Sequence, residues 1–138
     1  MSKGEVDVAL MGPIAYLRVD PKVKAQLMFR TVRNGKSTYR SVLFAPPTSK
    51  LTSLEALKKS KTPLKVVVMS SEVPNDVMVS APKFSQGKVD AIIAAAKAAA
   101  TTADGKKALQ AALLAEGVAD VKDEDFAPLR KALDAFVP

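Results

Sequence analysis

The sequence contains no cysteine, no histidine and no tryptophan. Without cysteine the chain cannot form disulfides or bind a metal through thiolates, and without histidine it lacks the commonest general base and the commonest metal ligand. Zinc hydrolases, cysteine–histidine proteases and Ser-His-Asp hydrolases are therefore excluded. We expect neither a metal nor another cofactor.

Long apolar runs are also missing. No run approaches the roughly 18 residues that suggest a membrane-spanning helix. The opening MSKGEVDVAL has neither the apolar segment nor the small-residue cleavage site of a signal peptide. We therefore expect neither a membrane span nor a signal peptide in this chain.

The chain is long enough to bury a core. Its 138 residues, 48% hydrophobic and 25% charged, fit one globular domain over residues 1–138. We divide this domain into a strand-rich part, residues 1–82, and a helical part, residues 83–138.

The net charge of +7 is unevenly distributed. Residues 1–65 hold 13 Lys and Arg against 4 Asp and Glu, whereas residues 66–138 hold 8 against 10. The excess positive charges in the first half stand singly and form no block of like charge, which is typical of a solvated face. A nucleic-acid-binding module is therefore the less favoured of the functions that a basic chain allows.

The first part reads as strands separated by sharp turns. Residues 6–11 form an apolar run that Gly12-Pro13 stops, which suits a buried strand followed by a short helix. Asp20-Pro21 closes that helix. The Asn34-Gly35 pair between two β-rich runs predicts a hairpin, because both residues tolerate positive φ.

Further elements follow before residue 83. Thr52 or Ser53 is a suitable cap for a helix over residues 54–59. Residues 63–71 and 77–82 are strand-like apolar runs, and Pro74-Asn75-Asp76 forms a corner between them.

The second part changes to helix. Ser85 is a suitable N-cap for the first helix, the second is expected from about Asp104 to Glu116 with Gly117 as its C′ residue, and the third starts near the acidic residues 123–125. Their apolar stripes are packing surfaces. We predict an α/β fold with a mixed sheet of about four to five strands, whose C-terminal helices cover one sheet face.

The sequence contains fragments of catalytic and phosphate-binding motifs, but each lacks the other residues that its motif requires. The segment Asn34–Ser37, NGKS, ends like a phosphate-binding loop, but the first glycine of that motif would fall at Arg30. Ser85–Lys88 has the S-x-x-K spacing of penicillin-recognising enzymes without their other elements. No pair of carboxylates occurs together with other residues of a catalytic site, so a glycosidase dyad is not indicated. We predict that the chain is not an enzyme.

Several segments together carry a resemblance to a known family. They are, in order, GEVDVALMGPIAY from Gly4, VRNGKSTYRSVLF from Val32, LTSLEALK from Leu51 and LKVVVMSSEVPNDVMVSAP from Leu64. The chain resembles the periplasmic solute-binding proteins of bacterial phosphate, phosphite and phosphonate ABC transporters, and the similarity covers most of it. The resemblance implies a type II periplasmic binding fold, a periplasmic location, a small phosphorus oxyanion as ligand and an ABC permease as partner.

The chain also departs from that family. Family members have two lobes around a ligand cleft, and the second lobe would follow LEALKK, where this sequence continues directly into the returning strand at residue 64. The strand–helix units that would precede residue 4 are missing too. The fold is therefore interpreted as the remnant of one lobe.

The resemblance implies which residues meet the ligand. The corner at Pro74 would lie at the cleft, with Asn75 shaping the bend and Asp76 bonding the ligand or a ligand ammonium. The other candidate substrate-binding residues are Met11, Gly12 and Pro13 in a second wall, Tyr16 behind it, and Tyr39 on the hairpin. Asp76 could equally form a local turn with its own backbone, and the two tyrosines could be packing residues.

Two function classes stay open. One is a solute-binding component, or a lobe derived from one. The other is a ligand-free scaffold or engineered fragment that associates with itself, because the unpaired edge of the strand at residues 6–11 or of the hairpin would recruit a partner. We expect a homo-oligomer. Which anion binds, and whether another chain supplies the missing lobe, does not follow from the sequence.

Overall fold

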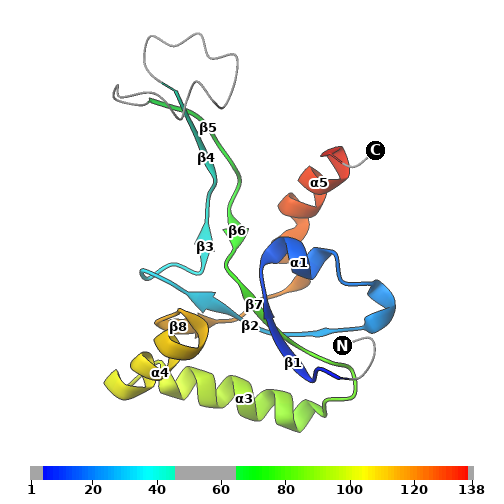
Figure 1. Ribbon diagram of the computed structural model, residues 1–138, viewed down its shortest axis with the longest axis vertical. Coiled ribbons are helices and arrows are strands. Elements are labelled where there is room, and N and C mark those ends of the chain that lie inside the picture. The colour runs from blue at the N-terminus through cyan, green and yellow to red at the C-terminus, as the bar shows by residue number, and fades with distance from the viewer. Residues whose placement is uncertain (1–4, 46–64, 137–138) are drawn as a thin grey trace. The chain divides into compact units, whose positions relative to one another are not determined.

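The computed structural model describes residues 5–45 and 65–136 (Figure 1). The chain divides into two compact units, one formed by residues 1–39 with 73–138 and the other by Arg40–Glu72. The helix expected at residues 54–59 lies outside the described residues. The single domain expected from the composition stays a prediction.

A four-stranded sheet forms the centre of the larger unit, in the order β1-β7-β2-β8. Its strands are β1 (Val8–Met11), β2 (Gln26–Val32), β7 (Val77–Ser80) and β8 (Gly117–Ala119). The α/β class and the strand number are confirmed. The sheet is antiparallel rather than mixed, because β7 returns between β1 and β2 and so separates the two strands that run in the same direction.

Helices follow the sheet strands in the order expected. They are α1 (Pro13–Leu17), the 3₁₀ turn η1 (Pro21–Val23), α3 (Gln86–Ala99), α4 (Ala103–Leu113), the 3₁₀ turn η2 (Asp123–Phe126) and α5 (Ala127–Phe136). Ser85 occupies the N-cap of α3 but makes no capping bond through its side chain. Thr102 caps α4 by accepting a hydrogen bond from the Gly105 N–H.

The predicted end of the second helix is wrong. The helix α4 stops at Leu113, and Leu114 takes the left-handed conformation with φ 52°. Gly117 instead begins β8, opposite Val32. A Cβ at this glycine would lie 3.7 Å from the Cβ atoms of both Val32 and Ala100, so the residue serves a strand packed closely against its neighbours.

The turn at Asn34-Gly35 forms as predicted, but the hairpin does not extend. Both residues have positive φ, 52° and 70°, and the backbones of Arg33 and Lys36 bond each other at 2.9 and 3.0 Å. Beyond this pair the strands separate, because β2 pairs with β7 and β8 while β3 (Thr38–Tyr39) pairs with β6 (Val73–Pro74). The prediction of an extended hairpin is therefore wrong, because β2 and β3 pair with strands distant in sequence and not with each other.

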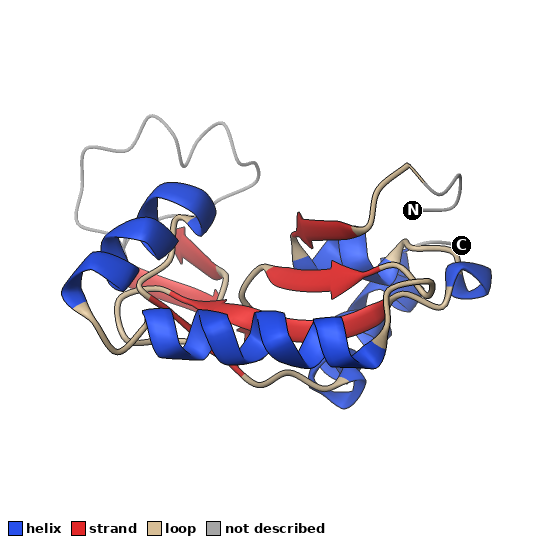
Figure 2. Ribbon diagram, turned by 90° about the horizontal axis from the view of Figure 1, so that it is seen from below, coloured by secondary structure: helices blue, strands red, loops and turns tan. Residues whose placement is uncertain are grey.

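One face of the sheet packs against α3, which runs along it in Figure 2. β2 has a register shift between Leu27 and Phe29, so Met28 and Phe29 both turn to this face. They form a buried cluster with Val89 of α3. Side chains packed around this cluster are Val8, Met78, Phe84, Ile92, Ile93, Ala96, Leu113 and Val118.

The opposite face is covered by η2 and α1. Val77, Val79 and Phe126 are fully buried there. Side chains packed around them are Ala9, Met11, Tyr16, Leu17, Ala25, Leu27 and Val121. The C-terminal helical segments thus cover both faces rather than the one face expected, because the chain crosses the sheet edge through β8 between α4 and η2.

The smaller unit contains a pair of antiparallel strands, β4 (Val42–Ala45) and β5 (Lys65–Met69). The strand expected over residues 63–71 is confirmed by β5. Next to this strand pair, the Ser70 N–H donates to the Ser41 carbonyl and the Ser41 N–H donates to the Ser70 hydroxyl oxygen, both at 2.9 Å. Arg40 forms an ion pair with Glu72 at 3.2 Å.

Candidate functional site at the corner between β6 and β7

The corner at Asn75 and Asp76 is held from both sides by backbone hydrogen bonds. The Asn75 N–H donates to the Ser37 carbonyl at 3.0 Å, and the Asp76 carbonyl accepts from the Thr31 N–H at 2.9 Å. Both partners belong to β2 and the connection that follows it. The conformation of the corner is therefore set by residues some 40 positions earlier in the chain.

Asn75 is a structural residue of this corner. Its side chain is buried, and its amide nitrogen donates to the carbonyls of Thr31 at 3.1 Å and Lys36 at 2.9 Å. These bonds tie the corner to one backbone carbonyl in β2 and to another in the turn that follows β2. Both amide hydrogens are thereby used in holding the chain and are not directed at solvent.

Asp76 forms an ion pair with Arg33. Its Oδ2 accepts a hydrogen bond from Arg33 Nη2 at 2.6 Å, and about a third of each side chain is exposed. Arg33 Nε also donates to the Leu114 carbonyl at 2.9 Å, which fixes the guanidinium at the end of α4. The carboxylate is thus bound to a cation and not to its own backbone, the local alternative that the sequence left open.

Arg33 is a site residue that the sequence reasoning missed. Its only sequence signal was its place just before the Asn34-Gly35 turn. That turn carries the guanidinium toward both α4 and the corner, which are distant in sequence. Arg33 balances the charge of Asp76 at the corner, and its guanidinium remains partly exposed to solvent.

The end of β1 lies next to the corner. Met11 pairs with Val77, and a Cβ built at Gly12 would lie 3.6 Å from Asp76 Oδ1. Pro13 is buried at the start of α1. The structure therefore brings together five of the sequence-predicted site residues, namely Met11, Gly12, Pro13, Asn75 and Asp76.

Tyr16 lies in a different environment. Its hydroxyl donates to Asp123 Oδ1 at 2.9 Å, and its ring centroid is 4.7 Å from that of Phe126. Burial, helped by the bond to the Asp123 carboxylate, raises the pKa of Tyr16 to about 12. Tyr16 thus packs against η2 and forms a hydrogen bond with it.

Asp123 also accepts two hydrogen bonds from Arg130 Nη2, at 3.0 and 3.2 Å. Burial acts to raise the pKa of Asp123, but the bonds from Arg130 and Tyr16 outweigh it and hold the pKa below its usual value. These residues line a cavity of about 300 Å³. Its other lining residues are Leu17, Val19, Asp20, Pro21, Lys24 and Ala25.

Tyr39 belongs neither to the corner at Asp76 nor to the group formed by Tyr16, Asp123 and Arg130. It lies on β3 opposite Val73, and 44% of the residue is exposed. Within residues 5–45 and 65–136, acidic side chains form no group of three or more that could hold a metal ion. None of the helices described is long and apolar enough to cross a bilayer.

Comparison with family models gives a match to the first part of the chain. Residues 1–62 match the model of the family described as "ABC transporter, phosphonate, periplasmic substrate-binding protein". This confirms the resemblance over that part of the chain, which includes Met11, Gly12, Pro13 and Arg33. No curated protein sequence gives a significant match.

Two solved structures of XAC2383 from Xanthomonas citri share the fold. The one described as bound to ATP has a TM-score of 0.68 and 11% identity, and the match covers 94% of this chain and 77% of that chain. The one described as bound to chloride ion has a TM-score of 0.70 and 13% identity, with 96% and 80% covered. At this identity the similarity establishes the fold alone, and it extends over nearly the whole chain.

Proposed function

Because residues 1–62 match the substrate-binding family of phosphonate ABC transporters, we propose that this chain is a solute-binding component of such an uptake system or a lobe derived from one. It binds a small phosphorus oxyanion, either phosphate, phosphite or a phosphonate, without converting it. The family match is the single observation that carries this proposal. The same match favours a periplasmic location and an ABC permease as partner, and it favours a binding protein over an enzyme.

The binding surface is the corner. Arg33 supplies the cationic group. Its Nε and Nη2 bond the Leu114 carbonyl and Asp76, so an oxygen of the anion binds at Nη1 or replaces Asp76 at Nη2. Asp76 holds Arg33 in place, and Gly12 leaves the approach to the carboxylate free of a side chain. Met11 and Pro13 form the neighbouring wall, and Asn75 fixes the turn from behind. Tyr16 and Tyr39 stay further from the anion.

Binding by this one wall is weak. Part of the ligand stays in water, where each exposed ionic contact contributes about 1 kcal/mol or less. We therefore expect at best millimolar affinity, on the order of −4 kcal/mol. Moderate salt should abolish it, because exposed charges are screened.

Calorimetric titration with phosphate, phosphite, methylphosphonate and ATP tests the proposal. ATP is included because the structural neighbour XAC2383 is described with it. We expect Arg33→Gln to remove binding, whereas Asp76→Ala should leave it unchanged or strengthen it, because the change releases Arg33 from its ion pair. Asp104→Ala, which removes an equal charge from an exposed position on α4, is the matched control.

Two results would contradict this assignment. Binding that survives Arg33→Gln would place the anion elsewhere. Micromolar binding that resists high salt and is lost on Asp76→Ala would mean that the site is closed on all sides and that Asp76 itself contacts the ligand.

A further inference from the structure

The strand β1 forms one edge of the sheet in the larger unit (Figure 1). It pairs with β7 on one side, and no described strand pairs with it on the other. Edge strands expose rows of unpaired backbone N–H and C=O groups, and proteins commonly protect them with charged side chains, proline or very short length. The edge formed by residues 6–11 contains no proline and one charged side chain, Asp7.

The register shows which residues of β1 expose their backbone groups. The Ala81 N–H donates to the Asp7 carbonyl at 2.8 Å, and the same antiparallel register continues through Ala9 and Met11. In an antiparallel pair, alternate residues bond the neighbour and those between them point away. Val6, Val8 and Leu10 therefore direct their N–H and C=O groups outward from the sheet.

The same residues carry exposed apolar side chains. Val6 is 42% exposed and Leu10 is 38% exposed, although both belong to the apolar run. Asp7 is the charged residue between them, and Lys83 forms an ion pair with it at 2.9 Å. The edge thus combines free backbone groups with apolar surface, both of which a further strand would cover.

We propose that a second copy of this chain pairs with β1 through the same strand, antiparallel and with Val8 opposite Val8 of the copy. In this register Val6 of each copy lies opposite Leu10 of the other, so the two exposed apolar side chains cover each other twice. Asp7 lies opposite Ala9. Such a two-fold contact is self-complementary and makes one continuous sheet from two.

Charge favours this register over its neighbour. A pairing centred on Asp7 would place the two Asp7 carboxylates directly opposite each other, which is destabilising. The other sheet edge is less suited to pairing, because β8 has only three residues and is followed by Asp120 and Lys122. The self-complementary surface is therefore residues 5–11.

Sedimentation velocity of the full chain over a wide concentration range tests the dimer. We expect a monomer–dimer equilibrium that Leu10→Lys weakens by about tenfold or more, since each dimer loses two apolar cross-strand pairs. The control is Leu114→Lys, which changes a residue that is 67% exposed and lies after α4. A monomer at every concentration, or equal effects of the two substitutions, would overturn the proposal.

Disulfide formation tests the register, because the chain has no cysteine of its own. Residues opposite each other in a hydrogen-bonded pair have Cα atoms about 5.5 Å apart, within the range of a disulfide. Val8→Cys should therefore give a covalent dimer on mild oxidation. Val6→Cys should not, because the two copies of residue 6 would be about 13 Å apart along the strand. The reverse result would refute the register.

Amide hydrogen exchange identifies any other occupant of the edge. We expect the amides of Val8 and Leu10 to exchange quickly in dilute solution and slowly at concentrations where the dimer forms. If these amides are already protected in a monomer, another segment covers β1 and the self-pairing proposal fails.

Discussion

Two of the three arginine–aspartate ion pairs described in the larger unit have the same chemistry and different surroundings. Arg33 and Asp76 lie at a corner that a buried asparagine ties to the backbone, and Arg33 also bonds the end of α4. Arg130 lies on α5 and Asp123 on η2, beside a cavity, and Tyr16 bonds Asp123. The first pair is built into the connection between strands, whereas the second is attached to the outside of the core.

This difference indicates which pair can serve recognition without changing the fold. The geometry at Asp76 is fixed by backbone bonds that do not involve the ion pair, so a ligand can compete for Arg33 while the corner keeps its shape. At Asp123 the hydrogen bond from Tyr16 adds a titratable group, so that cluster depends on pH. Four predictions test the contrast.

The largest effect is expected beneath the second pair. Phe126 is fully buried and its ring packs against Tyr16, so Phe126→Ala should lower the free energy of unfolding by about 3–5 kcal/mol. Phe84→Ala removes the same group from a partly exposed site and should cost clearly less. Urea denaturation measures both, and equal losses would mean that η2 is not part of the core.

Asn75→Ala should lower the free energy of unfolding by about 1–3 kcal/mol, because it removes the two hydrogen bonds that the buried Asn75 amide donates to the carbonyls of Thr31 and Lys36. Gln110→Ala, an exposed change on α4, should have little effect in the same urea denaturation. A loss no greater than that of this control would show that the corner does not depend on its asparagine.

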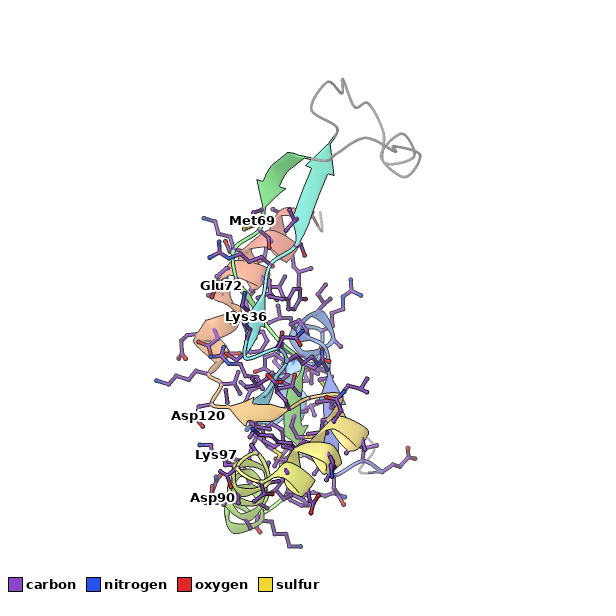
Figure 3. The ribbon with its side chains drawn as sticks, turned by 90° about the vertical axis from the view of Figure 1, so that its left-hand side faces the viewer. Lys36, Met69, Glu72, Asp90, Lys97 and Asp120 are labelled. Carbon is purple, nitrogen blue, oxygen red and sulfur yellow. The ribbon has the colours of Figure 1, made fainter. Side chains whose placement is uncertain are left out.

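The two arginines should differ when each is replaced by methionine. Arg33→Met removes the bonds to Asp76 and to the Leu114 carbonyl. It should lower the free energy of unfolding by about 1–2 kcal/mol, a modest value because both side chains are partly exposed and solvent screens their charges. Arg130→Met removes an exposed pair and should cost less than about 1 kcal/mol. Thermal or urea unfolding ranks them, and the reverse order would contradict the contrast. The exposed Lys97–Asp120 pair, labelled in Figure 3, should be similarly weak.

Tyr16→Phe should have the smallest effect at neutral pH and a specific one in alkali. The pKa of Tyr16 is about 12 in the folded state against 10.0 for the free side chain, so folding favours its neutral form. That stabilisation is complete below pH 10 and is lost as the pH rises through about 12. The wild type should therefore lose more stability over this interval than Tyr16→Phe.

The pKa itself can be measured directly, because the chain has only two tyrosines and no tryptophan. In Tyr39→Phe the tyrosinate absorbance reports Tyr16 alone. A midpoint near the ordinary pKa of tyrosine would show that Tyr16 is neither buried nor bonded to Asp123.

The sequence by itself determined most of the local structure. Periodicity located β1, β2, β5, β7 and the helices, and Asn34-Gly35 located a turn with positive φ. It also located the corner at Asn75-Asp76 and placed Met11 to Pro13 near it through the family resemblance. These features follow from side-chain pattern and backbone preference within a few neighbouring residues.

Only the tertiary structure decided the pairings. Whether β2 continues a hairpin or joins β7 depends on which partner buries more apolar surface, and local sequence does not contain that comparison. The same holds for Gly117, which β8 needs opposite Val32 and which therefore does not end α4. The partner of Asp76 was hidden for this reason too, since Arg33 reaches it only after the sheet brings two segments 43 residues apart together.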